Sequence, residues 1–294
     1  MRAAGVRLSR RLRKVVSVCR WIAYIGKPIF VDALVVRPTC SLVEQSLNSK
    51  FSFRSDGSIL STNGDGFGLG WYMHRPEPGL FKTAEPAWAN ENINEICSQV
   101  QARIFMAHIR AASTGAIQRT NAHPFKYRNW LFQHNGYLAH FDALRRDLQF
   151  DIGDEYFGCL KGTTDSETLF LLALTFGLES DPKQAIERVI ARVKRACGER
   201  AVPFELIMST ALSDGQSIYT VRFASGTHVH SQYYSTHAAC MRDIDDNAET
   251  VPARSVVVVS EPLDQSMEHW NEMPVGAFAT IRDGAIRIDS LATE

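Results

Sequence analysis

The middle of the chain carries two long helical patterns, and strand-like patterns lie on both sides of them. The first, residues 165–178, has acids in its first turn and apolar residues on most faces, which predicts a buried helix. The second, residues 181–200, opens with a cap at Asp181 followed by Pro182, and continues as an amphipathic stripe. A helix that is apolar on most faces must be covered by other layers. We therefore expect sheets sandwiched between helices in one domain of the α+β class.

The strand-like stretches on either side support this layered arrangement. A run of four valines within residues 254–263 suits a strand that is buried on both faces. Asp214-Gly215 and Asp283-Gly284 are hairpin signals, and Ser41 is a candidate cap for a short helix. The expected strands are residues 21–26, 67–74, 102–112, 129–136, 203–215, 216–223, 228–236, 254–263 and 277–288, and the shorter helices are residues 41–47, 92–100 and 141–149.

Charge and cysteine usage narrow the classes of function. The formal net charge is zero, and no apolar run reaches the ~18 residues that a membrane span needs, so we expect neither nucleic-acid nor membrane partners. The six cysteines include no CxxC pair and no His/Cys cluster at zinc spacing, so no metal site is predicted. A reducing, cytoplasmic compartment fits this usage. Five of them are expected to be small buried residues: Cys40, Cys97, Cys159, Cys197 and Cys240.

Residues 1–18 differ in composition from the rest of the chain. They hold six basic residues and no acid, which leaves 26 basic and 32 acidic residues, a net charge of −6, in residues 19–294. Cys19 follows them directly, at the head of the first strand pattern. The sequence therefore divides into a basic N-terminal extension, residues 1–18, and one folded domain, residues 19–294.

Five short stretches place polar residues and glycines at the ends of expected strands. They are Cys19-Arg20, residues 63–68 (NGDGFG), residues 108–114 (HIRAAST), residues 121–125 (NAHPF) with residues 134–136 (HNG), and residues 164–167 (TDSE). Each is a weak signal alone, but the series in this order is specific. Together they resemble the class II glutamine amidotransferases, whose catalytic domain is an N-terminal-nucleophile hydrolase. The resemblance implies a four-layer αββα sandwich.

Further stretches resemble the stand-alone members of that family. CRWIAYIGKP, RPTCSLVEQS, PAWANENI and SEPL with a later tryptophan are similar to the group that contains the fungal glutathione-degrading amidotransferase subunit. The amidohydrolase of ergothioneine biosynthesis belongs to the same wider group. The resemblance implies a glutamine amidotransferase domain over residues 19–294, with no metal or organic cofactor.

In this family the first residue supplies both the nucleophile and its base, and the resemblance assigns that position to Cys19. The thiol attacks the substrate, while the free α-amine accepts the thiol proton and later passes it to the departing ammonia or amine. An α-amine has a pKa of about 7.7–8, so it can be neutral near physiological pH. The alternative for Cys19, taken by itself, is a buried strand cysteine.

The resemblance places the oxyanion hole at Asn135 and Gly136, through the side-chain amide and a backbone N–H. Asn-Gly is also a common turn, but its position after the strand pattern of residues 129–134 favours the functional interpretation. Arg110 would hold the α-carboxylate of a glutamyl substrate, because its planar guanidinium suits a carboxylate. Asp165 would accept the substrate α-ammonium. Its alternative is a helix N-terminal acid, and both roles can hold.

The resemblance implies supporting roles for the other residues of these motifs. Ser113 and Thr114 would contact the same substrate carboxylate. The site wall would be shaped by Asp65, Gly66 and Gly68, since glycine permits close backbone approach. Because the amine acts as the base, three histidines are interpreted as structural polar residues: His108, His123 and His134.

The amine mechanism conflicts with the residues in front of Cys19, because a peptide-bonded nitrogen is not a base. Three explanations remain open. Val18 stands where family members carry the initiator methionine, so a GTG codon there would start the protein next to Cys19. Residues 1–18 could instead be a propeptide that is cut before Cys19, or an Arg-rich targeting or binding tail.

The expected function is hydrolysis of a γ-glutamyl amide, either glutamine or a γ-glutamyl peptide, through a γ-glutamyl thioester on Cys19. The chain has no room for a synthase domain, so ammonia would pass to a synthase partner subunit, or hydrolysis itself would be the purpose. A peptidase-like partner is implied by the resemblance alone. The alternative is an inactive homologue that binds γ-glutamyl compounds or regulates a partner. The retained motif residues argue against it, and the blocked amine argues for it.

Overall fold

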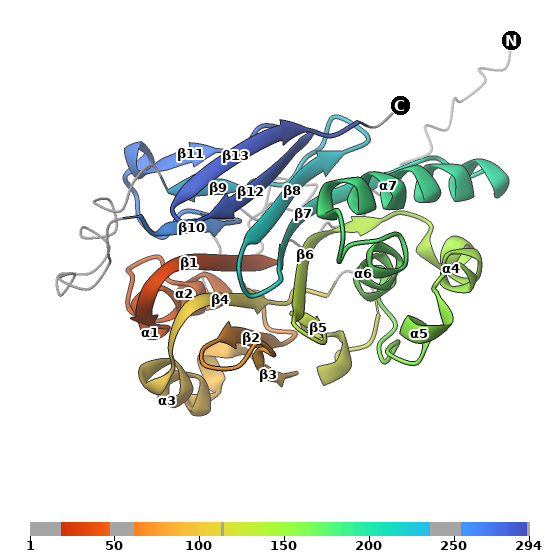
Figure 1. Ribbon diagram of the computed structural model, residues 1–294. Coiled ribbons are helices and arrows are strands. Elements are labelled where there is room, and N and C mark those ends of the chain that lie inside the picture. The colour runs from red at the N-terminus through yellow and green to blue at the C-terminus, as the bar shows by residue number, and fades with distance from the viewer. Residues whose placement is uncertain (1–18, 48–61, 113–114, 236–253, 293–294) are drawn as a thin grey trace, which may run out of the picture.

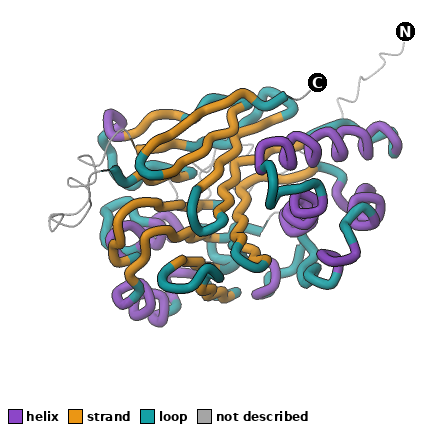
Figure 2. Tube along the Cα trace, in the orientation of Figure 1, coloured by secondary structure: helices purple, strands orange, loops and turns teal. Residues whose placement is uncertain are grey.

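The computed structural model describes residues 19–47, 62–112, 115–235 and 254–292, and these form two antiparallel sheets between two layers of helices (Figure 1). The first sheet has the strand order β11-β9-β10-β1-β4-β2-β3, and the second has the order β13-β12-β8-β7-β6-β5. Figure 2 shows the helices on the outside and the strands between them. This is the four-layer αββα sandwich that the sequence predicts.

The elements of the first half-molecule belong to the first sheet and its helices. Its strands are β1 (Arg20–Phe30), β2 (Phe67–Tyr72), β3 (Gly79–Thr83), β4 (Gln101–Ile109), β9 (Tyr233–Ser235), β10 (Val256–Val259) and β11 (Trp270–Glu272). The helices on its outer face are α1 (Asp32–Val35), α2 (Leu42–Leu47) and α3 (Glu91–Gln99). Short 3₁₀ turns cover Ala87–Ala89 and Met267–His269.

The second sheet and its helices form the other half. Its strands are β5 (Phe125–Tyr127), β6 (Trp130–Leu138), β7 (Leu206–Ser213), β8 (Ile218–Ala224), β12 (Ala277–Arg282) and β13 (Ala285–Ser290). The helices on its outer face are α4 (Phe141–Phe150), α5 (Asp154–Phe157), α6 (Asp165–Thr175) and α7 (Pro182–Glu199). A 3₁₀ turn over Arg119–Asn121 precedes β5.

Strand β1 shows how a side-chain period of two builds these layers. Ile22 and Tyr24 belong to the core beneath α1–α3, whereas Trp21 and Ala23 belong to the core between the two sheets. The valine run Val256–Val259 alternates in the same way and is buried throughout, which confirms the predicted strand with two buried faces. Both strands therefore lie in the interior, and β1 carries Cys19 at its beginning.

Helices α6 and α7 begin where their local signals predict. Thr164 is the N-cap of α6, and its hydroxyl accepts the N–H of Glu167 at 3.2 Å. Asp181 caps α7, accepting the N–H of Gln184 at 3.0 Å. Helix α6 is buried along its first ten residues, as its composition predicts. Its position against β6 brings the first turn of α6, including Asp165, to the end of that strand.

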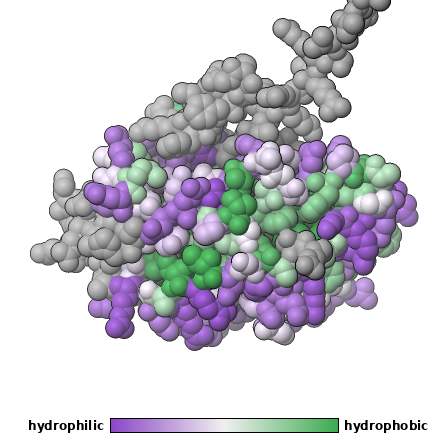
Figure 3. Space-filling model, turned by 90° about the horizontal axis from the view of Figure 1, so that it is seen from above, coloured by the Kyte–Doolittle hydropathy of each residue, from purple (hydrophilic) through white to green (hydrophobic). Residues whose placement is uncertain are grey.

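On the face shown in Figure 3, polar side chains and apolar patches lie side by side. Within the described ranges, none of the helices combines the length and the apolar character needed to cross a membrane. Cys40, Cys97 and Cys197 are buried, as predicted. Cys159 is half-buried, which corrects the prediction that it is buried, and Cys240 lies outside the described residues.

Candidate active site

Cys19 lies directly before β1, where the pairing of β1 with β4 sets its neighbours. Arg20 pairs with Ile109 at the end of β4, so Cys19 faces the segment that follows this strand. Its Sγ accepts the N–H of Ala111 at 3.3 Å, and the thiol lies 3.5 Å from the Ala111 carbonyl oxygen. The thiol is half-buried at this position.

Arg110 follows β4 and is buried next to this thiol. Its backbone N–H donates to the Gly66 carbonyl at 2.8 Å, and its guanidinium donates to the Ala116 carbonyl at 3.1 Å. Burial lowers the pKa of Arg110, and the charges of Cys19, Asp65 and Asp165 act in the opposite direction. The structure therefore brings Arg110 into the electrostatic neighbourhood of three predicted site residues.

The glycine-rich stretch that leads into β2 (Phe67–Tyr72) lies along the same strand end. Asp65 donates its N–H to the Arg110 carbonyl at 3.0 Å, and its carboxylate accepts the N–H of Ala112 at 2.7 Å. Gly66 has φ +133°, which favours glycine. A Cβ on Gly68 would lie 1.8 Å from the carbonyl oxygen of His123. These contacts place Asp65 and Gly66 beside Arg110, and their role as a site wall stays a prediction.

Asn135 sits on β6, on the face that points toward the first sheet. Gln133, two residues earlier on the same face, donates to the Ile22 carbonyl of β1 at 3.0 Å. The side-chain nitrogen of Asn135 is buried, and among the described residues it has no hydrogen-bond partner. A Cβ on Gly136 would lie 2.0 Å from the Ile207 carbonyl oxygen, so only glycine fits there. A buried donor without a partner is a candidate for binding an oxyanion.

Asp165 is buried at the first position of α6 and has a structural task there. One carboxylate oxygen accepts the N–H of Leu138 at 2.7 Å, and the other accepts the N–H of Ser166 at 2.7 Å. The first of these bonds ties α6 to the end of β6. Asp165 therefore acts as an acid at the N-terminus of α6. Its contact with a substrate ammonium stays a prediction. Ser113 and Thr114 lie outside the described residues.

The three motif histidines are buried, and each has a pKa below the usual value of the imidazole because of that burial. The pKa of His108 falls to about 3, and that of His123 falls well below its normal range. His134 contacts the Ser166 hydroxyl at 2.9 Å and the Ile207 carbonyl at 3.0 Å. These side chains are neutral at physiological pH, which suits structural polar residues better than proton carriers.

The thiol of Cys19 is not pre-ionised by its surroundings. Burial raises the pKa of Cys19, and Asp65 adds to this effect. The Ala111 N–H and the charges of Arg110 and Arg20 lower it, but the pKa remains above its ordinary value. Because the thiolate is the nucleophilic form, a reaction at Cys19 requires a base.

Comparisons with known proteins identify the family. Residues 40–293 match the family described as "Glutamine amidotransferases class-II". The chain belongs to this family. It is 29% identical over 312 residues to the "Probable glutamine amidotransferase DUG3" of Saccharomyces cerevisiae, and the alignment covers 94% of this chain and 85% of that protein. It is 22% identical over 275 residues to the "Gamma-glutamyl-hercynylcysteine sulfoxide hydrolase" of Mycolicibacterium smegmatis, which covers 93% of this chain and all of that protein.

A solved structure supports the same conclusion. The "glutamine aminotransferase class-II domain protein" of Silicibacter pomeroyi superposes with a TM-score of 0.67 at 32% identity, covering 93% of this chain and 100% of that one. The family, its stand-alone subgroup and the αββα fold are therefore confirmed. This class II glutamine amidotransferase is an enzyme of a family that acts on small molecules. The roles of single residues rest on the geometry above and stay predictions.

Sequence reasoning assigned no role to a buried ion pair beside Cys19 of this amidotransferase. Arg20 and Glu261 form a salt bridge in which both side chains are almost fully buried. Arg20 also donates to the Cys19 carbonyl at 3.1 Å, so the pair anchors the residue that carries the thiol. Ser260 fixes the neighbouring position through its hydroxyl, which accepts the Trp21 N–H at 2.9 Å. Both Ser260 and Glu261 belong to the SEPL stretch, residues 260–263, and only the fold shows that this stretch contacts the start of β1.

The described residues offer no candidate metal centre. No group of three His, Cys, Asp or Glu side chains lies close enough there to hold an ion.

Proposed function

We propose that this amidotransferase hydrolyses a γ-glutamyl amide through a γ-glutamyl thioester on Cys19. The observation that carries the proposal is the placement of the Cys19 thiol beside Arg110. The amide of Asn135, which has no partner among the described residues, lies on the face of β6 that points toward β1. A nucleophile, a carboxylate-binding cation and an oxyanion donor are the groups that acyl transfer from a glutamyl substrate requires.

In the first step the neutral α-amine of Cys19 takes the thiol proton, and the sulfur attacks the γ-carbonyl carbon. The Asn135 amide and the Gly136 N–H stabilise the resulting oxyanion, and one such donor is worth about 2.7–4 kcal/mol. The amine then returns the proton to the departing nitrogen as the C–N bond breaks. The products are a γ-glutamyl thioester and ammonia or a free amine.

Water completes the cycle at the same carbon. The amine accepts a proton from the water molecule, which adds to the thioester and forms a second tetrahedral intermediate. The C–S bond breaks, the proton returns to the sulfur and glutamate leaves. The raised pKa of the Cys19 thiol favours this regeneration of the protonated form, but it makes the base necessary in the first step.

Two charges of opposite sign would recognise the glutamyl group. Arg110 binds its α-carboxylate, with help from Ser113 and Thr114, and Asp165 accepts its α-ammonium. The substrate class is glutamine or, more specifically, a γ-glutamyl peptide of the glutathione type. The mycobacterial relative, named as a hydrolase of a γ-glutamyl compound, supports the second choice. Cytoplasmic location and a peptidase-like or synthase partner subunit belong to the same proposal.

The mechanism requires a free amine on Cys19, so the active chain begins at this residue. The test uses two forms of the protein, verified by intact mass: one that begins at Cys19 and one that begins at Met1. The first should hydrolyse γ-glutamyl-p-nitroanilide and carry a transient adduct with the mass of one glutamyl group. Equal activity of the longer form would contradict the role of the amine.

Two cysteine variants of the shorter form complete this test. Cys19→Ala should abolish turnover and the adduct, because the nucleophile is removed. Cys159→Ala, a half-buried cysteine in the loop before α6, should retain both. An adduct that persists in Cys19→Ala would show that the thioester forms elsewhere.

A further inference from the structure

A pocket lies between the edge strands of the two sheets. It is bounded by β3 of the first sheet, β5 of the second and one side of α6, and has a volume of about 220 Å³. Its apolar wall includes Leu80, Phe125 and Phe170. We call it the basic pocket because four cationic side chains line it: Lys82, Arg119, Lys126 and Lys161.

The charges of the basic pocket do not balance among its lining residues. Glu167 is the one carboxylate in that lining, which leaves a surplus of three positive charges. Its two oxygens already accept backbone N–H groups, from Lys161 at 3.1 Å and from Gly162 at 2.6 Å. Concentrated positive charge in a partly apolar cavity is costly unless an anion offsets it.

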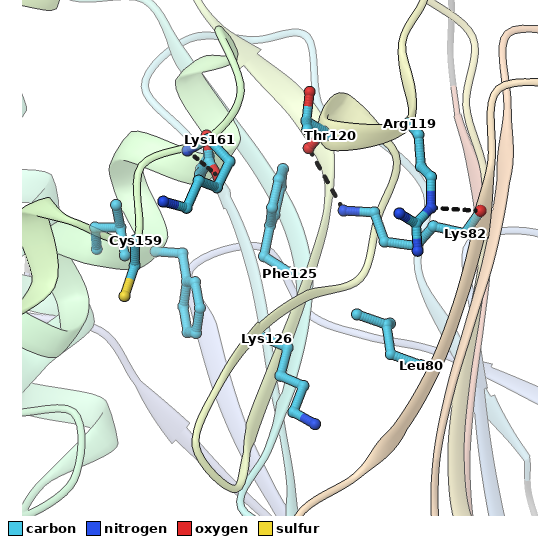
Figure 4. A pocket seen from close by; sticks show the side chains of 11 residues that line it. Leu80, Lys82, Arg119, Thr120, Phe125, Lys126, Cys159 and Lys161 are labelled. Carbon is cyan, nitrogen blue, oxygen red and sulfur yellow. Dashed lines mark hydrogen bonds between the residues drawn. The ribbon is translucent and has the colours of Figure 1, made fainter.

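The cations are positioned by neutral backbone oxygens. Lys82 lies over the ring of Phe125, 4.9 Å from its centre, and its Nζ is 3.4 Å from the Thr120 carbonyl. Arg119 is fixed through Nε to the Lys82 carbonyl at 3.1 Å, and no hydrogen bond from its outer nitrogens is seen in the part of the chain that the structure describes. Figure 4 shows Lys82 and Arg119 together on one side of Phe125 and Lys161 on the other. Burial also lowers the pKa of Lys82, to about 8.

A layer of polar side chains separates the basic pocket from the Cys19 site. Asn121 donates to the Thr163 hydroxyl at 3.0 Å and to the Ala116 carbonyl at 2.9 Å. That carbonyl is the one that the Arg110 guanidinium also binds. The two sites share a wall but have different linings, and the basic pocket contains no residue of the proposed catalytic machinery.

We propose that the basic pocket binds a small organic phosphate. Its phosphate group would contact Lys82, Arg119 and Lys161, and its apolar part would lie on Phe125 and Leu80. A surplus of three positive charges matches a dianionic phosphate better than a single carboxylate, and a guanidinium pairs well with phosphate oxygens. The apolar wall explains why an organic phosphate fits better than inorganic phosphate. The inference does not depend on the substrate of the Cys19 site.

The experiment is a calorimetric titration of the chain with phenyl phosphate, which combines a dianion with an apolar ring. The intact protein and Cys19→Ala should bind it equally well. Lys82→Met and Arg119→Gln should each bind it about tenfold more weakly or worse, as expected for one lost charge-assisted contact. Lys194→Gln is the matched control, because Lys194 is an exposed lysine on α7 outside the pocket, and its affinity should stay within about twofold.

Several results would overturn the proposal. They are an absence of binding by the intact protein at about 10 mM phenyl phosphate, an equal loss of affinity in Lys194→Gln and Arg119→Gln, and a loss of binding in Cys19→Ala. Inorganic phosphate and phenol are titrated as separate probes and should both bind more weakly than phenyl phosphate. Equal affinity for inorganic phosphate would refute the role of the apolar wall. Thermal unfolding of each variant shows whether it is folded. If Lys82→Met does not fold, Arg119→Gln provides the test, because Arg119 is at an exposed position.

Discussion

His134 and Asn135 are consecutive on β6, face opposite sides of the sheet and differ in how their polar atoms are satisfied. Both ring nitrogens of His134 have partners, the Ser166 hydroxyl and the Ile207 carbonyl. The side-chain nitrogen of Asn135 is equally buried and has none among the described residues. A buried donor without a partner lowers the stability of a fold, and for the Asn135 amide we expect a reacting atom to be the missing partner. Other buried polar atoms, such as both ring nitrogens of His123, also lack a partner among the described residues, so the contrast applies to this pair of neighbours.

The same contrast applies around Cys19. Glu261 is buried, and its carboxylate is paired with Arg20, which in turn holds the Cys19 carbonyl. The thiol itself contacts only backbone atoms of Ala111 among the hydrogen bonds seen in the described residues. A substitution in the Arg20–Glu261 pair should therefore reduce the stability of the fold, whereas a substitution of Cys19 should reduce the rate of the reaction.

The largest expected effect is on stability, from Glu261→Gln. The change would remove the buried carboxylate that pairs with the Arg20 charge, and breaking a buried pair costs about 3–5 kcal/mol. Urea unfolding monitored by tryptophan fluorescence measures the free energy of unfolding. Glu268→Gln, at an exposed position in the neighbouring turn, should change it by less than about 0.5 kcal/mol. Equal stability of the two variants would show that the pair does not anchor β1.

Asn135→Ala should act on the rate. Loss of one oxyanion donor lowers kcat by about 10²–10³-fold, with little change in KM, because the ground-state carbonyl gains less from this amide than the oxyanion does. Steady-state kinetics with γ-glutamyl-p-nitroanilide measure both constants. A rise in KM with normal kcat would assign Asn135 to binding instead.

His134→Ala is the matched variant on the opposite face of β6. It leaves the Ser166 hydroxyl and the Ile207 carbonyl without their partner, so the free energy of unfolding should fall by about 1–3 kcal/mol. Asn135→Ala should keep the stability of the unchanged protein within about 1 kcal/mol, since the amide it removes has no partner there. If both variants lose the same stability, the distinction between the two faces is wrong.

Arg110→Lys should reduce kcat/KM by about 10–100-fold, because lysine keeps the charge but lacks the planar fork that matches a carboxylate. Arg195→Lys, at an exposed position on α7, is the control and should be neutral. A glutamyl substrate esterified at its α-carboxylate should be processed almost equally by Arg110→Lys and the unchanged enzyme. Near-normal kinetics of Arg110→Lys with the free carboxylate would refute the assignment.

The sequence predicted the structural features that depend on residues close together in the chain. The alternation in β1, the valine run in β10 and the cap of α7 are local patterns, and each element lies where its pattern indicates. Short elements were missed: α1, α5, β3, β5 and β11 have three to five residues each, too few for a period to stand out. The order of polar motifs along the chain indicated the family, and hence the candidate site.

Features that join distant parts of the chain could not be predicted in this way. Arg20 and Glu261 are 241 positions apart, and nothing in either local sequence announces the other. The basic pocket combines Lys82 from β3 with Lys161 from the loop before α6, and only the packing of two sheet edges brings them together. Likewise, the missing partner of Asn135 is a property of the folded interior. The sequence predicts which groups react, whereas only the fold shows which of them lack a partner among the described residues.

The smallest expected effect concerns pH and the basic pocket. Lys82 has its pKa lowered to about 8 by burial, with Glu167 opposing and Arg119 reinforcing the shift. Lys126 and Lys161 also face the pocket but are exposed. Because only the protonated amine attracts a phosphate, phenyl phosphate should bind up to about tenfold more weakly at pH 9 than at pH 7. Lys82→Met should show a flat profile over this range. If Lys82→Met shows the same decline in affinity, another group titrates. The proposed contact between Lys82 and the phosphate would then be wrong.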